Sequence, residues 1–166
     1  MGVASLDTYM HVLVYQSAYE MNPMPRSLAQ FGINFEDVVS LADQAVSARR
    51  REVDGRPRVA AKNALQKSLM RKTFQRYEDV STAFALAGKK KVWTQAGQQL
   101  HPTASPESIK ARLNSIVDRR NQIVHEGDLQ RQSKPRQPRL NNVTSNEAAA
   151  DLDYVEALIH AIDAVI

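Results

Sequence analysis

The spacing of apolar residues is the feature that most constrains the fold of this chain. Apolar side chains recur every three or four residues in nearly every segment, and no segment alternates convincingly at two. This spacing gives a helix one apolar face, whereas a half-buried strand needs a period of two. The clearest example steps by three and four residues along Leu152, Val155, Ile159, Ile162 and Ile166. The sequence therefore predicts an all-α bundle of four to five main helices plus short helices.

Residues that cap or break helices set the bounds of the expected elements. A first helix covers roughly residues 4–21 and ends at two prolines, which remove backbone donors. Thr144 and Glu147 form a capping box for the last helix, and Ser105 is the expected cap of the one before it. The polar residues at about 126–143 form a loop between these two. Other helices are expected from Phe35 (after an Asn34 cap) toward Arg49, from Pro57 toward Phe74, over 77–87 with Gly88 as the stop, and over 92–100.

Length and composition indicate a single domain. The 166 residues suffice for one core and are too few for two comfortable ones, so residues 1–166 are interpreted as one unit. The absence of cysteine excludes disulfides and thiolate metal sites and fits a cytoplasmic location. No apolar run reaches the roughly 18 residues of a membrane span, and no signal peptide is visible. Because the chain stops within an apolar pattern at Ile166, a fragment of a longer protein is a second interpretation.

The net charge of +4 is unevenly distributed along the chain. Residues 49–76 hold ten Lys and Arg against two acids, whereas residues 1–48 and 147–166 carry net charges of −4 and −5. A basic middle between acidic ends fits a polyanion site, helices that pair by charge, or simply a solvated face. The basic stretch is the candidate track for an RNA phosphate backbone, with a solvated helix as the alternative. The residues assigned to that track are Arg49, Arg50, Arg71 and Lys72, with Arg119 added from the later helix.

Arg120 breaks the pattern of its own helix. On a helical wheel it lies in the middle of an apolar stripe, where leucine would be expected; the stripe consists of Ile109, Leu113, Ile116, Val117, Ile123 and Val124. A buried unpaired charge costs several kcal/mol, so Arg120 needs a carboxylate, an interface or an anionic ligand. Arg119 lies on the side expected to face solvent.

His125 follows Arg120 by five residues, about 140° away around a regular helix. One unbroken helix therefore does not direct both groups at a single point. Either a turn around Gly127 redirects the histidine, or a second copy of the chain shares the site. In the purely structural alternative, Arg120 pairs with an acid such as Asp7 and His125 caps the helix. His11, Tyr77 and Trp93 are interpreted as core or boundary residues.

Three segments resemble a known family. The run Arg120-Asn121-Gln122-Ile123-Val124-His125 is similar to the signature of HEPN domains, and here Glu126-Gly127-Asp128 follows it. The opening Leu6-Asp7-Thr8-Tyr9-Met10-His11 and the segment Arg71-Lys72-Thr73-Phe74-Gln75 resemble the prokaryotic branch called RiboL-PSP-HEPN. The resemblance extends from about residue 3 to residue 166.

The resemblance implies a helical bundle that forms a homodimer and cleaves RNA without a metal or other cofactor. In that family the arginine and histidine of two protomers line one cleft, in a prokaryotic toxin or defence context. His125 would act as base or acid near neutral pH, and Arg120 would stabilise the phosphorane charge. Asn121 would orient the histidine or the phosphate. The implied products are a 2′,3′-cyclic phosphate and a 5′-hydroxyl.

The resemblance also leaves a second function open. Some family members bind RNA or nucleotides without cutting, so the alternative is a non-catalytic dimerisation or RNA-binding module of a larger defence system. An antitoxin or additional domains are further expected partners. Some HEPN toxins carry a tyrosine two residues after the histidine, as the target of a nucleotidyltransferase antitoxin. Gly127 holds that position here, so regulation by that route is not supported.

Overall fold

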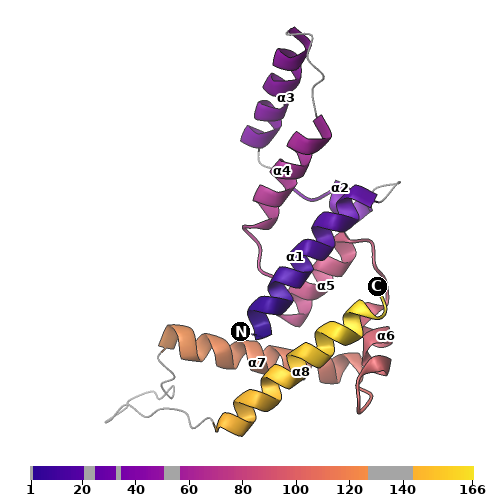
Figure 1. Ribbon diagram of the computed structural model, residues 1–166, viewed down its shortest axis with the longest axis vertical. Helices are drawn as coiled ribbons and strands as arrows, with labels where there is room; N and C mark the ends of the chain where they lie inside the picture. The colour runs from indigo at the N-terminus through magenta and orange to yellow at the C-terminus, as the bar shows by residue number, and fades with distance from the viewer. Residues whose placement is uncertain (1, 21–24, 33–34, 51–56, 127–143) are drawn as a thin grey trace.

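The computed structural model describes residues 2–20, 25–32, 35–50, 57–126 and 144–166. This part of the chain contains eight α-helices and no strand, which confirms the predicted all-α class (Figure 1). The helices are α1 (Gly2–Glu20), α2 (Arg26–Ala29), α3 (Phe35–Arg50), α4 (Pro57–Leu69), α5 (Tyr77–Leu86), α6 (Val92–Gln99), α7 (Pro106–Glu126) and α8 (Ser145–Asp163).

The capping residues act as the sequence predicted. The Thr144 hydroxyl accepts a hydrogen bond from the Glu147 backbone N–H at 3.2 Å, and the Glu147 carboxylate accepts one from the Thr144 N–H at 2.9 Å. The Ser105 hydroxyl accepts a hydrogen bond from the Ser108 N–H at the start of α7. Gly88 ends α5 with a φ of 67°, a conformation that suits glycine. Asn34 and the expected loop residues 127–143 lie outside the described residues.

One helix prediction was wrong in detail, and one helix was not predicted. The third expected helix does not continue to Phe74, because α4 ends at Leu69 and the chain turns toward α1. The Asp7 carboxylate on α1 accepts a hydrogen bond from the Phe74 N–H at 2.5 Å, which replaces the helical partner of that donor. The short helix α2 had no counterpart in the prediction.

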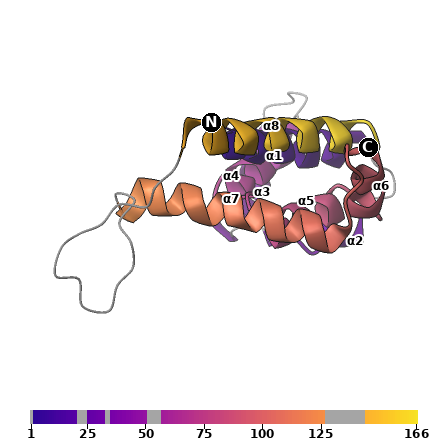
Figure 2. The same cartoon turned by 90° about the horizontal axis from the view of Figure 1, so that it is seen from below.

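The core lies between α1, α5, α6, α7 and α8, which form the body of the molecule (Figures 1 and 2). Side chains from four of these helices are almost fully buried together, and burying each stabilises the fold by about 1.5–3 kcal/mol. They include Leu6, Met10, Val14, Val80, Ile109, Leu113, Val117, Val155, Leu158 and Ile162. Trp93 is buried as predicted, stacks on Tyr77 at 4.4 Å, and donates its indole N–H to the Ser81 hydroxyl. His11 packs beside Phe74 at the core boundary, with ring centroids 4.8 Å apart.

The predicted stripe of the last helix is confirmed at its centre and wrong at its beginning. Val155 and Ile162 are buried, and Leu158 is buried with them. Leu152 is 47% exposed, although the first residues of α1 reach it. The spacing of apolar residues shows which face of a helix is apolar, because a helix turns every 3.6 residues. It does not show where along the helix the neighbouring helices end.

Helices α3 and α4 lie side by side and project from the body as an arm (Figure 1). The Lys67 ammonium of α4 bonds the buried Asp37 carboxylate of α3 at 2.8 Å. The second expected helix was predicted to bury an apolar face, but Val38 and Val39 are exposed. The sequence gives α3 an apolar face, as predicted. Within the described residues α4 is the principal helix that packs against α3, so most of that face is not covered by another helix.

Candidate functional site

The two halves of α7 have different surroundings. The first half packs against α5 and α6, and Leu113 and Val117 are 0% and 1% exposed. The second half continues past the beginning of α1 and leaves the body (Figures 1 and 2). There Ile123 is 48% exposed and Val124 is 57% exposed, although both continue the same apolar stripe. The residues predicted for catalysis, Arg120, Asn121 and His125, lie on this second half.

Contacts with the first turn of α5 fix the rotation of α7 about its axis. Arg76, the residue before α5, supplies no capping side chain, and the Asn114 amide oxygen of α7 accepts a hydrogen bond from the Tyr77 N–H at 3.0 Å. Lys110 pairs with Glu78 at 2.6 Å, and Asp118 pairs with Arg76. These contacts come from three successive turns of α7, so they set the direction in which the next turn presents its side chains.

A second set of contacts holds α7 to α8. Arg112 pairs with Asp151 at 2.7 Å and lies over the Tyr154 ring at 5.4 Å. Arg119 lies on this side too, close enough to Glu147 of α8 for its charge to act on that carboxylate. Hydrogen bonds from Thr144 hold the pKa of Glu147 below its usual value, and the charge of Arg119 lowers this pKa further. The expectation that Arg119 faces open solvent was therefore wrong, because its side chain is half-buried near the first turn of α8.

Arg120 is half-buried and lies on α7 between the buried Val117 and the exposed Ile123. One guanidinium nitrogen, Nη1, donates to the Asn121 amide oxygen at 3.0 Å. Among the described residues, no carboxylate forms an ion pair with Arg120. A guanidinium has five N–H donors, so a bond to one neutral amide leaves its charge and most of its donors available to an anion.

The alternative pairing of Arg120 with Asp7 is not observed. The Asp7 carboxylate instead accepts hydrogen bonds from the Phe74 N–H at 2.5 Å and from the Gln75 amide at 3.4 Å, and it lies 3.7 Å from His11 Nε2. These partners belong to the α4–α5 connection and to α1 itself. The acid that was considered for Arg120 therefore anchors a connection between helices.

His125 lies in the last turn of α7, and its side chain is outside the described part of the structure. The helix continues through Glu126, so no break separates position 120 from position 125. The two positions are therefore about 140° apart around one axis, as the regular helix predicts. Asn121 follows Arg120 directly and, as the hydrogen bond shows, its amide orients the guanidinium.

The cations predicted for an RNA track do not lie together. Arg49 and Arg50 are exposed in the last turn of α3, at the far end of the arm, whereas α7 ends on the opposite side of the body (Figure 1). Arg71 and Lys72 are exposed in the connection between α4 and α5. Proximity in sequence made one track of residues 49–76, but α4 runs back along α3 toward the body, which separates the two ends of that stretch (Figure 1).

Two further findings concern only the described residues. No group of three or more His, Cys, Asp and Glu side chains is placed there to hold a metal ion. No helix there is long and apolar enough to cross a membrane.

Comparison with known proteins adds a family to this geometry. The family model described as RiboL-PSP-HEPN matches residues 35–166, which include α3 to α8 and the whole Arg120–His125 segment. The match begins after α1, so the similarity of residues 6–11 to that family is not part of it. Searches of curated proteins and of solved structures found no significant match. Because the family model covers most of its length, the chain belongs to the RiboL-PSP-HEPN family of HEPN domains.

Proposed function

We propose that this protein is a metal-independent endoribonuclease that acts as a homodimer, in a prokaryotic toxin or defence context. The observation that carries the proposal is Arg120, a half-buried guanidinium oriented by Asn121 and not ion-paired with any carboxylate in the described part of the chain. Membership of the family supports a nuclease or an RNA-binding module in general. A charge kept available in this way suits an anionic ligand, and RNA supplies one phosphate per nucleotide.

The chemistry needs few protein groups, because RNA carries its own nucleophile. A base removes the proton of the 2′-hydroxyl, the 2′-oxygen attacks the adjacent phosphorus, and the 5′-oxygen leaves after an acid protonates it. His125 suits the base and acid roles, since imidazole titrates near neutral pH. Arg120 suits the developing negative charge on the phosphorane oxygens. The products are a 2′,3′-cyclic phosphate and a 5′-hydroxyl.

A second copy of the chain accounts for two features of α7 together. Ile123 and Val124 continue an apolar stripe beyond the body, where an apolar surface of another molecule would cover them. Positions 120 and 125 diverge on one helix, so a site that uses both groups is completed across two helices. A symmetric dimer through the second half of α7 would place two arginines and two histidines around one cleft.

The other cations take a secondary part in this proposal. Arg49 and Arg50 on the arm, Arg71 and Lys72 between α4 and α5, and Arg119 on α7 would contact phosphates at separate places. An antitoxin, additional domains of a longer protein and a cytoplasmic location stay predictions.

The experiment is incubation of total RNA with the protein in excess EDTA, followed by sequencing of the cut ends. We expect cleavage that leaves cyclic phosphates and that falls by about 10²–10⁴-fold in His125→Ala and by about 10²–10³-fold in Arg120→Ala. The control is Lys90→Ala, which removes an exposed cation from the connection between α5 and α6 and leaves the contacts of α7 described above intact.

Two results would decide against the proposal. Cleavage that persists in both folded variants would show that neither group takes part in it. Tight, salt-sensitive RNA binding with no cleavage of any RNA would identify the alternative, a non-catalytic RNA-binding module.

A further inference from the structure

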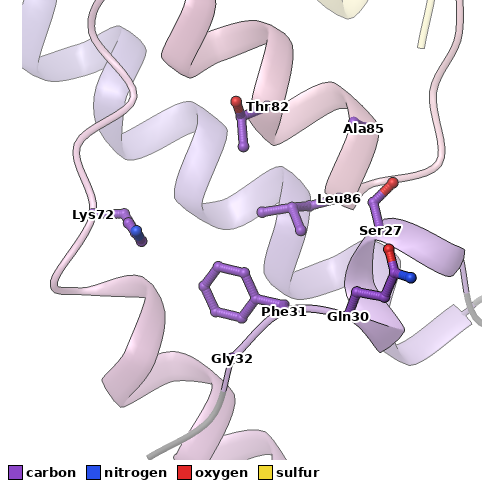
Figure 3. Close-up of a pocket in the computed structure, with 8 residues that line it drawn as sticks. All are labelled: Ser27, Gln30, Phe31, Gly32, Lys72, Thr82, Ala85 and Leu86. Atoms are coloured by element: carbon purple, nitrogen blue, oxygen red, sulfur yellow. The ribbon is translucent and has the colours of Figure 1, made fainter.

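An open hollow of about 470 Å³ lies on the body between α2, α5 and the α4–α5 connection (Figure 3). Phe31 occupies its middle, between Lys72 and Leu86. The remaining lining residues are Ser27, Gln30, Gly32, Thr82 and Ala85. The volume falls in the roughly 300–1,000 Å³ range of small-molecule sites. No residue of the hollow belongs to the Arg120 site.

The lining combines an aromatic ring, a cation and neutral hydrogen-bonding groups. Phe31 is half-buried against the core, so part of its ring stays accessible in the hollow. Lys72 is exposed at one side, and none of the eight lining residues is acidic. Ser27 and Gln30 offer donors and acceptors, and the Thr82 hydroxyl, which donates to the Glu78 carbonyl at 3.0 Å, keeps acceptor capacity.

Backbone contacts preform the hollow on both sides. The Lys72 N–H donates to the Leu69 carbonyl at 2.8 Å, and two residues later the Phe74 N–H is held by Asp7. The Phe31 N–H donates to the Leu28 carbonyl at 3.1 Å, which fixes Phe31 at the end of α2. Because Lys72 and Phe31 are both anchored through their own backbone, a ligand meets a site that needs little ordering.

We infer that this hollow binds one unpaired nucleotide of single-stranded RNA, its base on Phe31 and its phosphate on Lys72. Aromatic rings stack on bases of any sequence, and amide or hydroxyl groups then bond the exposed base edge. A lysine ammonium is a compact charge that suits a phosphate. The inference rests on the proposed function for the identity of the ligand, and it adds a substrate-holding site to it.

The hollow is separated from the proposed cleavage site along α5. Tyr77 and Glu78 in the first turn of α5 contact α7, whereas Thr82, Ala85 and Leu86 line the hollow at the other end. The helical rise from Glu78 to Leu86, eight residues further along α5, is about 12 Å. A strand bound at both places would therefore be held several nucleotides away from the bond that is cut, and RNA with an unpaired segment would be preferred over duplex.

The test measures binding of a fluorescent eight-nucleotide 2′-O-methyl oligouridylate to the full chain. This probe lacks the attacking hydroxyl, so binding is measured whether or not the protein cleaves RNA. We expect Phe31→Leu, which keeps apolar packing, to weaken binding about tenfold or more. Lys72→Gln is expected to weaken binding and to reduce the magnitude of the salt slope by about 0.7. The control Lys90→Gln removes an exposed cation outside the hollow and is expected to change neither.

A second pair of variants guards against misfolding of the first. Ala85 is exposed on α5 and lines the hollow, and both Glu and Gln are good helix formers. Ala85→Glu adds a negative charge and Ala85→Gln adds the same volume without charge. We expect the Glu variant to bind the oligonucleotide several-fold more weakly than the Gln variant.

Four outcomes would overturn the inference. The first is equal affinity of wild type, Phe31→Leu and Ala85→Glu for the oligonucleotide, and the second is a duplex probe whose affinity falls as much in these variants as that of the single strand. The third is binding of free UMP as tight as that of the oligomer. The fourth is a set of 4-thiouridine crosslinks that does not include Phe31. Failure of the proposed function would look different: hollow variants would still weaken binding while no RNA is cut in EDTA. Conversely, cleavage that depends on His125 together with normal oligonucleotide binding by hollow variants would remove only this inference.

Discussion

The two halves of α7 share one apolar stripe but not one environment. Leu113 and Val117 in the first half are buried in the core, whereas Ile123 and Val124 in the second half are about half exposed. The spacing of apolar residues is the same in both halves. Periodicity therefore defines which face of a helix is apolar, while the length of the neighbouring helices decides where that face is covered. The exposed end of this apolar stripe, next to an arginine whose charge is available, is the basis of the proposed dimer.

The largest expected contrast is in stability. Leu113→Ala should lower the free energy of unfolding by about 2–5 kcal/mol, because it leaves a cavity in the core. Ile123→Ala should change it by no more than about 0.5 kcal/mol in the monomer, since the side chain is half exposed. Urea unfolding at concentrations where the chain is monomeric measures both. Similar losses for the two variants would mean that the second half of α7 is packed within one chain.

The next effect concerns association. Val124→Asp places a charge on the exposed end of α7, so the dimer dissociation constant should rise by at least tenfold, about 1.4 kcal/mol. The monomer should keep its melting temperature, because no described core contact is lost. Analytical ultracentrifugation over a concentration series gives the constant. Val38→Asp on the arm is the matched control, and an equal effect there would move the dimer interface to α3.

A smaller effect is expected where α7 is clamped to α5. Asn114→Ala removes the acceptor for the Tyr77 N–H and should lower the free energy of unfolding by about 1 kcal/mol, as the loss of a helix cap does. Asn114→Asp restores an acceptor and should recover most of that stability. Thermal unfolding of the pair tests the role. An alanine variant as stable as wild type would show that water replaces Asn114 at no cost.

The smallest effect is the pH dependence of the cap of α8. Bonds from Thr144 hold the pKa of Glu147 below its usual value, so the folded state binds this proton less readily than the unfolded state does. The stabilisation is therefore complete above the unfolded pKa and disappears as pH falls through the folded pKa. The stability difference between wild type and Glu147→Gln should shrink between neutral pH and the acid range. A difference independent of pH would exclude the charged cap as its cause.

Local signals in the sequence predicted much of the fold. Prolines, a glycine with positive φ and the Thr144–Glu147 box defined helix ends correctly, because each acts through backbone atoms a few residues away. The position of Arg120 on its stripe was found in the same way. What was missed depends on distant partners: Asp7 on α1 binds the Phe74 N–H in the connection after α4, and α3 projects with its valines exposed.

The same difference between local signals and distant partners separates the two candidate sites. Arg120, Asn121 and His125 form one segment of sequence, so a motif was enough to find them. The hollow joins Phe31 and Lys72, forty-one residues apart, with residues of α5, and no spacing rule connects them. The only local signal was an aromatic residue in a polar stretch after the prolines that end α1.

Mixing two inactive variants tests the shared site most directly. Arg120→Ala chains keep His125 and His125→Ala chains keep Arg120, so only a mixed dimer brings one of each group to a common cleft. We predict that equal amounts of the two variants, refolded together, cleave RNA in EDTA clearly faster than either variant alone. If both variants fold and exchange subunits but the mixture stays as inactive as its components, the arginine and histidine of different copies do not form one site.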